Sequence, residues 1–360
     1  MILGILFFSW TVGMLSGLFN TGGSTETPSG ANFIHLETPD NPVGASVAVF
    51  SRYMLFFAIM PMFLLHVENE KFVNRCQQIF ELFLYANCVA IIVGYIFNIS
   101  FFSSYNPKAE ETLLDARFGY KGLLYGINET TGVFFLAFAH VYRELFLFRK
   151  KKYLLLATLI LASLLTGTKG CIIALVLVSS YYLFRYQKAL FFSIVIPAVI
   201  AGTIFLIQID FVEQVTAFLN IFWGDDFSTT PFGAVLTLLM TGRNIYIYNN
   251  WLYMLENWSV LNFLFGDGLL YSETDLMDLY YCFGLGTIAY LWGYTRLTFF
   301  RQKQFDLIFI FIFLLLLAFT GGHIIRSAVF PVFFCLYLIA GYRKVPEKTL
   351  PVHQNHLLLS

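Results

Sequence analysis

Ten long apolar runs constrain this chain more than any other feature of its sequence. They cover about residues 2–19, 45–66, 79–100, 123–146, 153–167, 170–184, 189–209, 276–295, 305–322 and 324–342. A helix of about 20 apolar residues crosses the hydrocarbon core of a bilayer. Hydrophobic residues make up 58% of the chain and charged residues only 12%, which excludes an ordinary soluble domain. We therefore expect an all-α polytopic membrane protein with about ten transmembrane helices.

The apolar runs leave only one long polar segment, about residues 210–275. We expect residues 1–342 to form a single transmembrane domain that includes this loop, and residues 343–360 to form a short polar tail. Within the loop, residues 244–258 mix Tyr, Trp, Leu and Ile in a helical pattern. We expect this helix to fold onto the membrane face, with its aromatic residues forming an interfacial belt in preference to a sugar-stacking surface.

The distribution of Lys and Arg predicts the orientation of the chain in the membrane. If the N-terminus is cytoplasmic, the inner ends and loops hold 15 of the 22 basic residues. Cytoplasmic loops are enriched in Lys and Arg, so both termini are expected to be cytoplasmic and the long loop to lie outside. The formal net charge is zero, and no basic run with interleaved aromatic residues suggests a nucleic-acid partner.

The five cysteines are scattered singly along the chain and do not indicate a metal or redox site. They are Cys76, Cys88, Cys171, Cys282 and Cys335. None belongs to a CxxC pair or to a Cys/His spacing that could hold zinc. We expect them to be small buried apolar side chains.

Charged residues gather where the polar loop meets the eighth apolar run. The planar guanidinium of Arg243 could hold a phosphate with two hydrogen bonds, although a solvated loop arginine is the simpler alternative. Ser272 and Asp275 have the spacing of a capping box, with Glu273 in the same first helical turn. Asp278 lies one turn deeper in an apolar run, where an acid needs a partner.

Further polar residues lie within or between apolar runs. The two runs around Lys169 have 15 residues each, which reach only about 22 Å of the roughly 30 Å hydrocarbon layer. Lys169 is therefore expected to face a wet cavity, an anion or backbone carbonyls, or else to reach up to the interface. If the fourth helix begins near Gly119, Lys121, Tyr125 and Asn128 share one of its faces. His323 lies at the same membrane face as the acids, where a structural role is equally compatible with its position.

Several of these segments together resemble a known family. Residues 118–129, with Lys121, Asn128 and Glu129, resemble the Gly-x-Lys-Gly…Asn-Glu stretch of bacterial O-antigen and capsule repeat-unit polymerases, the Wzy-type proteins. Residues 164–170 look like their next signature, and residues 241–243 look like the arginine that opens their large periplasmic loop. Residues 266–268 and 273–278 resemble the glycine turn and acidic entry to the next helix. Related O-antigen ligases carry a histidine where Glu273 stands, which favours a polymerase.

The resemblance implies a GT-C-like membrane glycosyltransferase in the bacterial inner (cytoplasmic) membrane. Such a polymerase works at the periplasmic face on undecaprenyl-diphosphate-linked oligosaccharides, which serve as both donor and acceptor, and it needs no cofactor. The partners implied are membrane lipid, a chain-length regulator and a flippase of the same pathway. The alternatives are an O-antigen ligase that transfers glycan to lipid A core, a lipid-linked oligosaccharide transporter, and a non-catalytic scaffold.

The residue types suggest a mechanism that fits this activity. Cations would clamp the diphosphate and stabilise its charge as the sugar bond breaks; the candidates are Arg243, Lys169, Lys121 and Arg117. Glu273, or Asp275 as second choice, would accept the proton of the attacking hydroxyl and give inversion. Supporting roles are assigned to Asp278, His323, Asn128 and Arg326. We expect no metal, because nearby cations could do the same electrostatic work.

Overall fold

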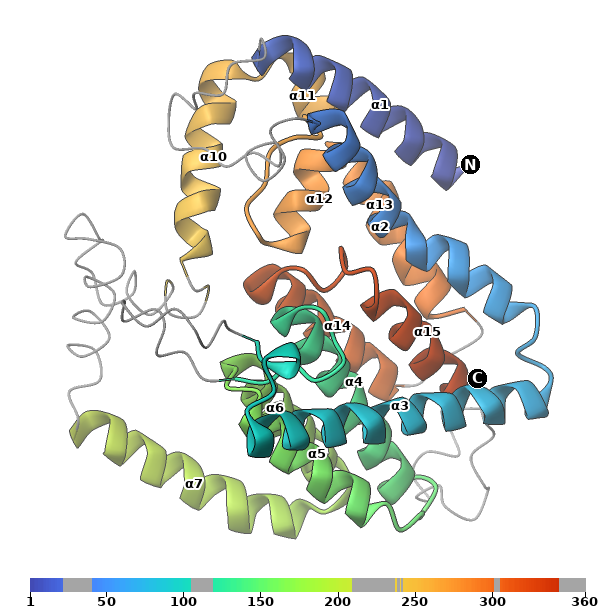
Figure 1. Ribbon diagram of the computed structural model, residues 1–360, viewed down its shortest axis with the longest axis vertical. Helices are drawn as coiled ribbons and strands as arrows, with labels where there is room; N and C mark the ends of the chain where they lie inside the picture. Colours follow the sequence, from blue (N-terminus) through green and yellow to red (C-terminus); the bar gives the residue numbers. More distant parts are fainter. Residues whose placement is uncertain are drawn as a thin grey trace. The chain divides into compact units, whose positions relative to one another are not determined.

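The computed structural model describes residues 1–21, 41–104, 119–208, 237, 240, 242–300 and 305–342 (Figure 1). Apart from one isolated bridge between Ser103 and Tyr120, the regular structure in these ranges is helical. The elements of the first half are α1 (Ile2–Thr21), α2 (Pro42–Leu64), α3 (Glu70–Phe97), η2 (Ser100–Phe102), α4 (Ile127–Phe146), α5 (Tyr153–Leu165), α6 (Lys169–Tyr186) and α7 (Lys188–Gln208). Those of the second half are α10 (Arg243–Asn257), α11 (Val260–Phe265), α12 (Asp275–Phe283), α13 (Gly286–Thr298), α14 (Phe305–Gly321) and α15 (Phe330–Gly341). The predicted all-helical class is confirmed for this part of the chain.

Three of the described helices are long and apolar enough to cross a bilayer. They are Val43–Leu64 within α2, Glu70–Phe97 and Lys169–Tyr186. Shorter apolar helices accompany them, namely Ile2–Leu18, Tyr153–Leu165, Lys188–Pro197, Asp306–Thr320 and Phe330–Gly341. The length and the composition of these helices indicate that the chain is associated with a membrane. Most of the predicted loop before α10 and the tail 343–360 lie outside the described residues.

Two apolar runs that we predicted as single helices are interrupted. The run 276–295 divides into α12 and α13 because Gly284 has a φ of 52°, a conformation that ends a helix. A Cβ at Gly284 would also overlap the backbone carbonyl of Leu264. The run 324–342 becomes helical only at Phe330, and the residues before it form a loop that reaches the acidic segment.

The predicted polar face of the fourth helix is wrong. This helix, α4, begins at Ile127 and not near Gly119, because Gly122 adopts a φ of 67°. The segment before α4 is an irregular loop that contacts α3. Its Leu123 donates a hydrogen bond of 2.8 Å from its backbone N–H to the Asn87 side chain. Lys121 and Tyr125 therefore precede the helix that contains Asn128, and the three side chains do not share a helical face.

The helices divide into two compact units. Unit 1 comprises Met1–Phe57 and Ala198–Ala328, and unit 2 comprises Ala58–Pro197 and Val329–Ser360. In unit 1, α1 packs against α11, α12 and α13, while α12 also packs against α14 (Figure 1). In unit 2, α4 is central and contacts α3, α5, α6 and α15. Every residue of α4 from Glu129 to Glu144 is buried, which includes the charged side chains of Arg143 and Glu144.

A polar cluster joins three segments of unit 2. The carboxylate of Glu81 accepts hydrogen bonds from Gln77 at 2.9 Å and Lys152 at 2.7 Å, and His140 Nε2 lies 3.0 Å from it. The guanidinium of Arg143 lies over the ring of Tyr337. The Glu81 contacts join α3 to α4 and to the α4–α5 connection, and the Arg143 contact joins α15 to α4. We assign these contacts a structural role.

Two glycines let α1 approach the connection between α11 and α12 closely. A Cβ on Gly13 would overlap the carbonyl oxygen of Phe265, and one on Gly17 would overlap the carbonyl oxygen of Asp267. The hydroxyl of Ser16 adds a hydrogen bond of 3.1 Å to Asn262. In contrast, a Cβ on Gly4 of the same helix would meet nothing within 4 Å. Small residues at such positions permit backbone contact between packed elements.

Substituting alanine for Gly13 should destabilise the folded protein, whereas the same change at Gly4 should not. Overpacking typically lowers the free energy of unfolding by about 1–3 kcal/mol, while Gly to Ala in an exposed helical position raises it by up to about 1 kcal/mol. Thermal unfolding of the detergent-solubilised variants measures the difference. Equal shifts from Gly13→Ala and Gly4→Ala would contradict close packing of α1 against this connection.

Candidate functional site

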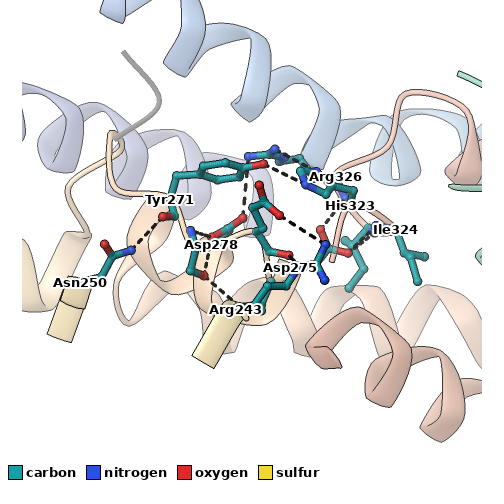
Figure 2. Close-up of polar contacts among 12 residues, drawn as sticks. Arg243, Asn250, Tyr271, Asp275, Asp278, His323, Ile324 and Arg326 are labelled. Carbon is teal, nitrogen blue, oxygen red and sulfur yellow. Dashed lines mark hydrogen bonds and ion pairs between the residues drawn. The ribbon is translucent and has the colours of Figure 1, made fainter. Parts of the chain in front are cut away.

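Three segments of unit 1 bring charged side chains together. They are the N-terminus of α10, the segment 271–278 that leads into α12, and the loop 322–326 that follows α14 (Figure 2). Arg243 is the first residue of α10, directly after Gly242, whose φ of 82° turns the chain into the helix. The predicted residues Arg243, Asp275 and Asp278 thus come together with His323 and Arg326, and Glu273 pairs with Arg243.

Asp275 anchors the loop that follows α14. Its Oδ2 accepts hydrogen bonds from the backbone N–H groups of Ile324 at 2.6 Å and Ile325 at 2.7 Å. Its Oδ1 accepts one from the backbone N–H of Arg326 at 3.4 Å. The side chain is fully buried. Burial raises the pKa of this carboxyl, and the hydrogen bonds from the loop oppose the shift. Both oxygens thus serve the loop, which makes Asp275 a poor acceptor for a substrate proton.

Asp278 has the partners that its deep position requires. Its Oδ1 accepts hydrogen bonds from the backbone N–H of Ser272 at 2.7 Å and from the hydroxyl of Ser272 at 2.9 Å. Its Oδ2 lies 3.8 Å from Arg326 Nη1. The prediction that Asp278 needs a partner is confirmed. The predicted capping box between Ser272 and Asp275 is wrong, because Ser272 binds Asp278 and the N-cap of α12 is Thr274.

Glu273 is the most exposed acid of this segment. Its Oε2 lies 3.3 Å from Arg243 Nη2, and its side chain is 36% exposed whereas that of Arg243 is 11% exposed. Arg243 also donates from Nε to the carbonyl of Glu273 at 2.9 Å and from Nη1 to the carbonyl of Met240 at 3.2 Å. Glu273 has a φ of 61°, and the carbonyl of Glu273 packs where a Cβ of Gly322 would stand. The backbone therefore presents this carboxylate in a fixed position.

His323 lies between Arg326 and Tyr271. Its Nδ1 is 3.0 Å from Arg326 Nη2, and its Nε2 is 2.9 Å from the Tyr271 hydroxyl. A guanidinium can only donate, so Nδ1 accepts, and a neutral imidazole must then carry its proton on Nε2 and donate to Tyr271. Burial, together with the charges of Arg326, Arg243 and Arg52, lowers the pKa of His323 to about 3. His323 is thus a neutral group that orients Tyr271, and it has no nitrogen available as a base.

Unit 2 holds the predicted residues Lys121, Asn128 and Lys169. Lys169 is the first residue of α6, and Asn128 is the second residue of α4. The two helix ends are neighbours, because a Cβ on Gly170 would contact the side chain of Thr131. Lys121 Nζ lies 5.6 Å from the centre of the Tyr125 ring. Arg117 lies outside the described residues.

Two site residues were missed by the sequence analysis. The Arg326 guanidinium lies over the ring of Tyr271, with its central carbon 4.3 Å from the ring centre. Asn250 of α10 donates to the carbonyl of Tyr271 at 2.9 Å and so ties α10 to the acidic segment. Nothing in the sequence distinguishes this tyrosine from the other 20 in the chain. Asn250 gave a weak signal as a polar residue on the otherwise apolar buried side of its helix.

Asp267, beside the site, should make the stability of the protein depend on pH. The carboxyl is fully buried and accepts a hydrogen bond of 3.2 Å from Trp258 Nε1. Burial raises its pKa from 3.8 to about 7. Because the folded pKa lies above the unfolded value, the folded state binds more protons between these limits, and stability falls as pH rises from about 4 to about 7. Unfolding measured across this range should show the slope, and Asp267→Asn should reduce it, leaving the part that comes from Asp275, whose pKa burial also raises. An unchanged slope in Asp267→Asn would assign the dependence to other groups.

The site thus combines one partly exposed carboxylate, its paired arginine, and a neutral histidine held between Tyr271 and Arg326. Among the described residues, no three His, Cys, Asp or Glu side chains are grouped as a metal site would require. Comparison of the chain with protein-family models, with curated proteins and with solved structures finds no match in any of the three. The case for a function therefore rests on the residues of the chain itself.

Proposed function

We propose that this chain is an inner-membrane glycosyltransferase that polymerises undecaprenyl-diphosphate-linked repeat units into O-antigen or capsular polysaccharide. In this proposal the chain has about ten transmembrane helices in a GT-C-like arrangement, with both termini cytoplasmic and the site facing the periplasm. The observation that carries the proposal is the pair of Glu273 and Arg243, which offers a proton acceptor beside a phosphate-binding group. The resemblance of short motifs in this chain to those of Wzy-type polymerases supports the proposed substrate class.

The proposed reaction is a single displacement at the anomeric carbon of the donor. The hydroxyl oxygen of the acceptor sugar attacks this carbon, its proton passes to the Glu273 carboxylate, and the bond to the diphosphate breaks. The diphosphate leaves with the bonding electron pair, and the configuration at the carbon inverts. Asp275 and Asp278 take no part in this step, because they hold the loop and Arg326 in place.

Arg243 could stabilise the leaving diphosphate without releasing its protein partners. A guanidinium has five N–H donors, and the contacts to the carbonyls of Glu273 and Met240 and to the Glu273 carboxylate engage three of them. The remaining N–H groups on Nη1 and Nη2 suit two phosphate oxygens. Lys169, Lys121 and Arg117 remain proposed as further cations of the clamp, with Asn128 in support.

The site geometry and the sequence favour a polymerase over a ligase or a transporter. A ligase with a histidine base would need an available imidazole nitrogen, but both nitrogens of His323 are engaged with Arg326 and Tyr271. A transporter of lipid-linked oligosaccharides would be expected to have corresponding broken helices in two halves of the chain. The sequence contains no such internal repeat.

Deleting the gene and examining the surface polysaccharide on a gel tests the proposal. Loss of a polymerase leaves single repeat units attached to the acceptor, and the wild-type gene restores a ladder. Loss of a ligase leaves the acceptor bare while polymer accumulates on lipid diphosphate. Loss of a transporter leaves the acceptor bare while single lipid-linked units accumulate. Either of the last two results would reject the polymerase in favour of that alternative.

A further inference from the structure

Arg52 is a cation in the middle of a candidate membrane span. It lies nine residues after Val43 and twelve residues before Leu64, the ends of the span within α2. At about 1.5 Å per residue, both ends are more than about 13 Å away along the helix axis. This distance is too long for the side chain to bring its charge to an interface. A guanidinium at such a depth faces a wet cavity or an anion.

The described part of the protein supplies no counter-charge in contact with Arg52. Among the described residues, the side chain of Arg52 has no hydrogen bond and no ion pair, and the residue is exposed. The other two arginines of the region differ in this respect. Arg243 pairs with Glu273, and Arg326 pairs with Asp278. The group that neutralises Arg52 must therefore come from outside the described chain.

The contacts of α2 place Arg52 near the candidate site. The hydroxyl of Ser46 donates to the carbonyl of Gly268 at 2.9 Å, so the start of α2 lies along the glycine turn. Tyr53, the next residue after Arg52, is fully buried, and its ring lies 5.8 Å from that of Phe283 at the end of α12. The charge of Arg52 also contributes to the lowered pKa of His323, as do those of Arg326 and Arg243. The charges of Arg326, Arg243 and Arg52 therefore all act on His323.

We propose that Arg52 is an anion-binding residue of this site and that, together with Arg243, it binds the diphosphate of the lipid-linked substrate. An arginine can grip two phosphate oxygens in a fork, and two arginines can hold both phosphates of a diphosphate. The identity of the anion rests on the proposed function. The binding of a diphosphate by Arg52 does not, and it can be tested without measuring polymerisation.

The absence of an ion pair to Arg52 among the described residues predicts how its replacement affects stability. A charge without such a partner does not stabilise the fold, so Arg52→Gln should unfold at the same temperature as wild type or higher. If the charge of Arg52 stabilised the fold through an ion pair, its removal would lower the unfolding temperature. A lower unfolding temperature for Arg52→Gln would show that Arg52 has a structural partner, and would overturn the inference.

Binding of farnesyl diphosphate to the detergent-purified full chain is the direct test. Arg52→Gln should weaken this binding at least about tenfold, since a hydrogen bond to a charged group is worth at least that factor. Arg52→Lys should recover part of the loss, because it restores the charge but not the fork. Arg296→Gln is the matched control and should bind like wild type, because Arg296 lies in the last turn of α13 over the ring of Trp292.

Three further ligands separate the possible sources of the anion. Farnesol measures binding through the isoprenoid tail alone, and inorganic pyrophosphate measures binding through the diphosphate alone. Nanodiscs of phosphatidylglycerol measure binding of an ordinary bilayer phospholipid. Wild-type affinity in Arg52→Gln, or equal binding of farnesol and farnesyl diphosphate, would overturn the inference. Loss of farnesyl diphosphate binding upon addition of phosphatidylglycerol would assign Arg52 to a phospholipid instead. If farnesyl diphosphate binds through Arg52 but deletion of the gene leaves the ladder normal, the inference stands and the proposed function fails.

Discussion

Replacing Glu273 with glutamine is expected to lower polymerisation at least about 100-fold and to leave single repeat units on the acceptor. General-base catalysis typically contributes a factor of about 10² to 10⁴, and an amide of the same shape cannot accept the proton of the attacking hydroxyl. The side chain is partly exposed, so the fold should tolerate the change. The measurement is the polysaccharide ladder of deletion cells that express either protein at matched levels in the membrane.

Glu256 provides the matched control for this substitution. It is an exposed acid near the end of α10, the same helix that begins with Arg243. Glu256→Gln removes one negative charge from the same loop and should leave the ladder unchanged. If Glu273→Gln also gives a normal ladder, Glu273 is only the ion-pair partner of Arg243, and the proposed mechanism is wrong.

Replacing Asp275 with alanine should cost the folded protein about 3–5 kcal/mol, the largest effect on stability that we expect from a single residue of the site. The change leaves the backbone N–H groups of Ile324 and Ile325 buried without an acceptor, and each unsatisfied buried group costs about 1–3 kcal/mol. Loss of the loop would also release Arg326, the partner of Asp278. Thermal unfolding in detergent, together with the yield of folded protein, measures the effect.

Two companion variants show whether the cost arises from the loop. Asp275→Asn retains one oxygen for the short hydrogen bonds to the loop, so its loss of stability should be smaller than that of Asp275→Ala. Glu256→Ala, on an exposed surface, should change stability by no more than about 0.5 kcal/mol. Wild-type stability of Asp275→Ala combined with complete loss of polymer would instead place this carboxylate in contact with the substrate.

The positions of most helices followed from composition, although α3 begins at Glu70, nine residues before the predicted run. The interruptions did not follow from composition. Apolar runs predicted the starts of α5 and α6 to within one residue of the observed Tyr153 and Lys169. They could not show that Gly284 adopts a positive φ value, because apolar character continues through this turn. A glycine within an apolar run is compatible with either a helix or a break, and the choice depends on which backbone lies against it.

Within the site, the sequence predicted which residues are unusual better than it predicted what they bind. The depth of Asp278 in an apolar run was a sufficient reason to expect a partner. The role of Asp275 had no such signal, since its partners are backbone N–H groups 49 and 50 positions away. Arg52 did have a signal, as a lone cation in an apolar run, and the same reasoning that singled out Asp278 applies to it.

The backbone at Glu273 and His323 has a consequence for any redesign of this protein. Both residues have positive φ values, 61° and 57°, which glycine adopts freely and residues with a side chain adopt uncommonly. Such conformations cost of order 1–3 kcal/mol each, so an optimisation of stability alone would introduce glycine at both positions. The resulting protein would be more stable but would lack the carboxylate and the imidazole. At these two positions the most stable sequence therefore differs from the sequence that the site requires.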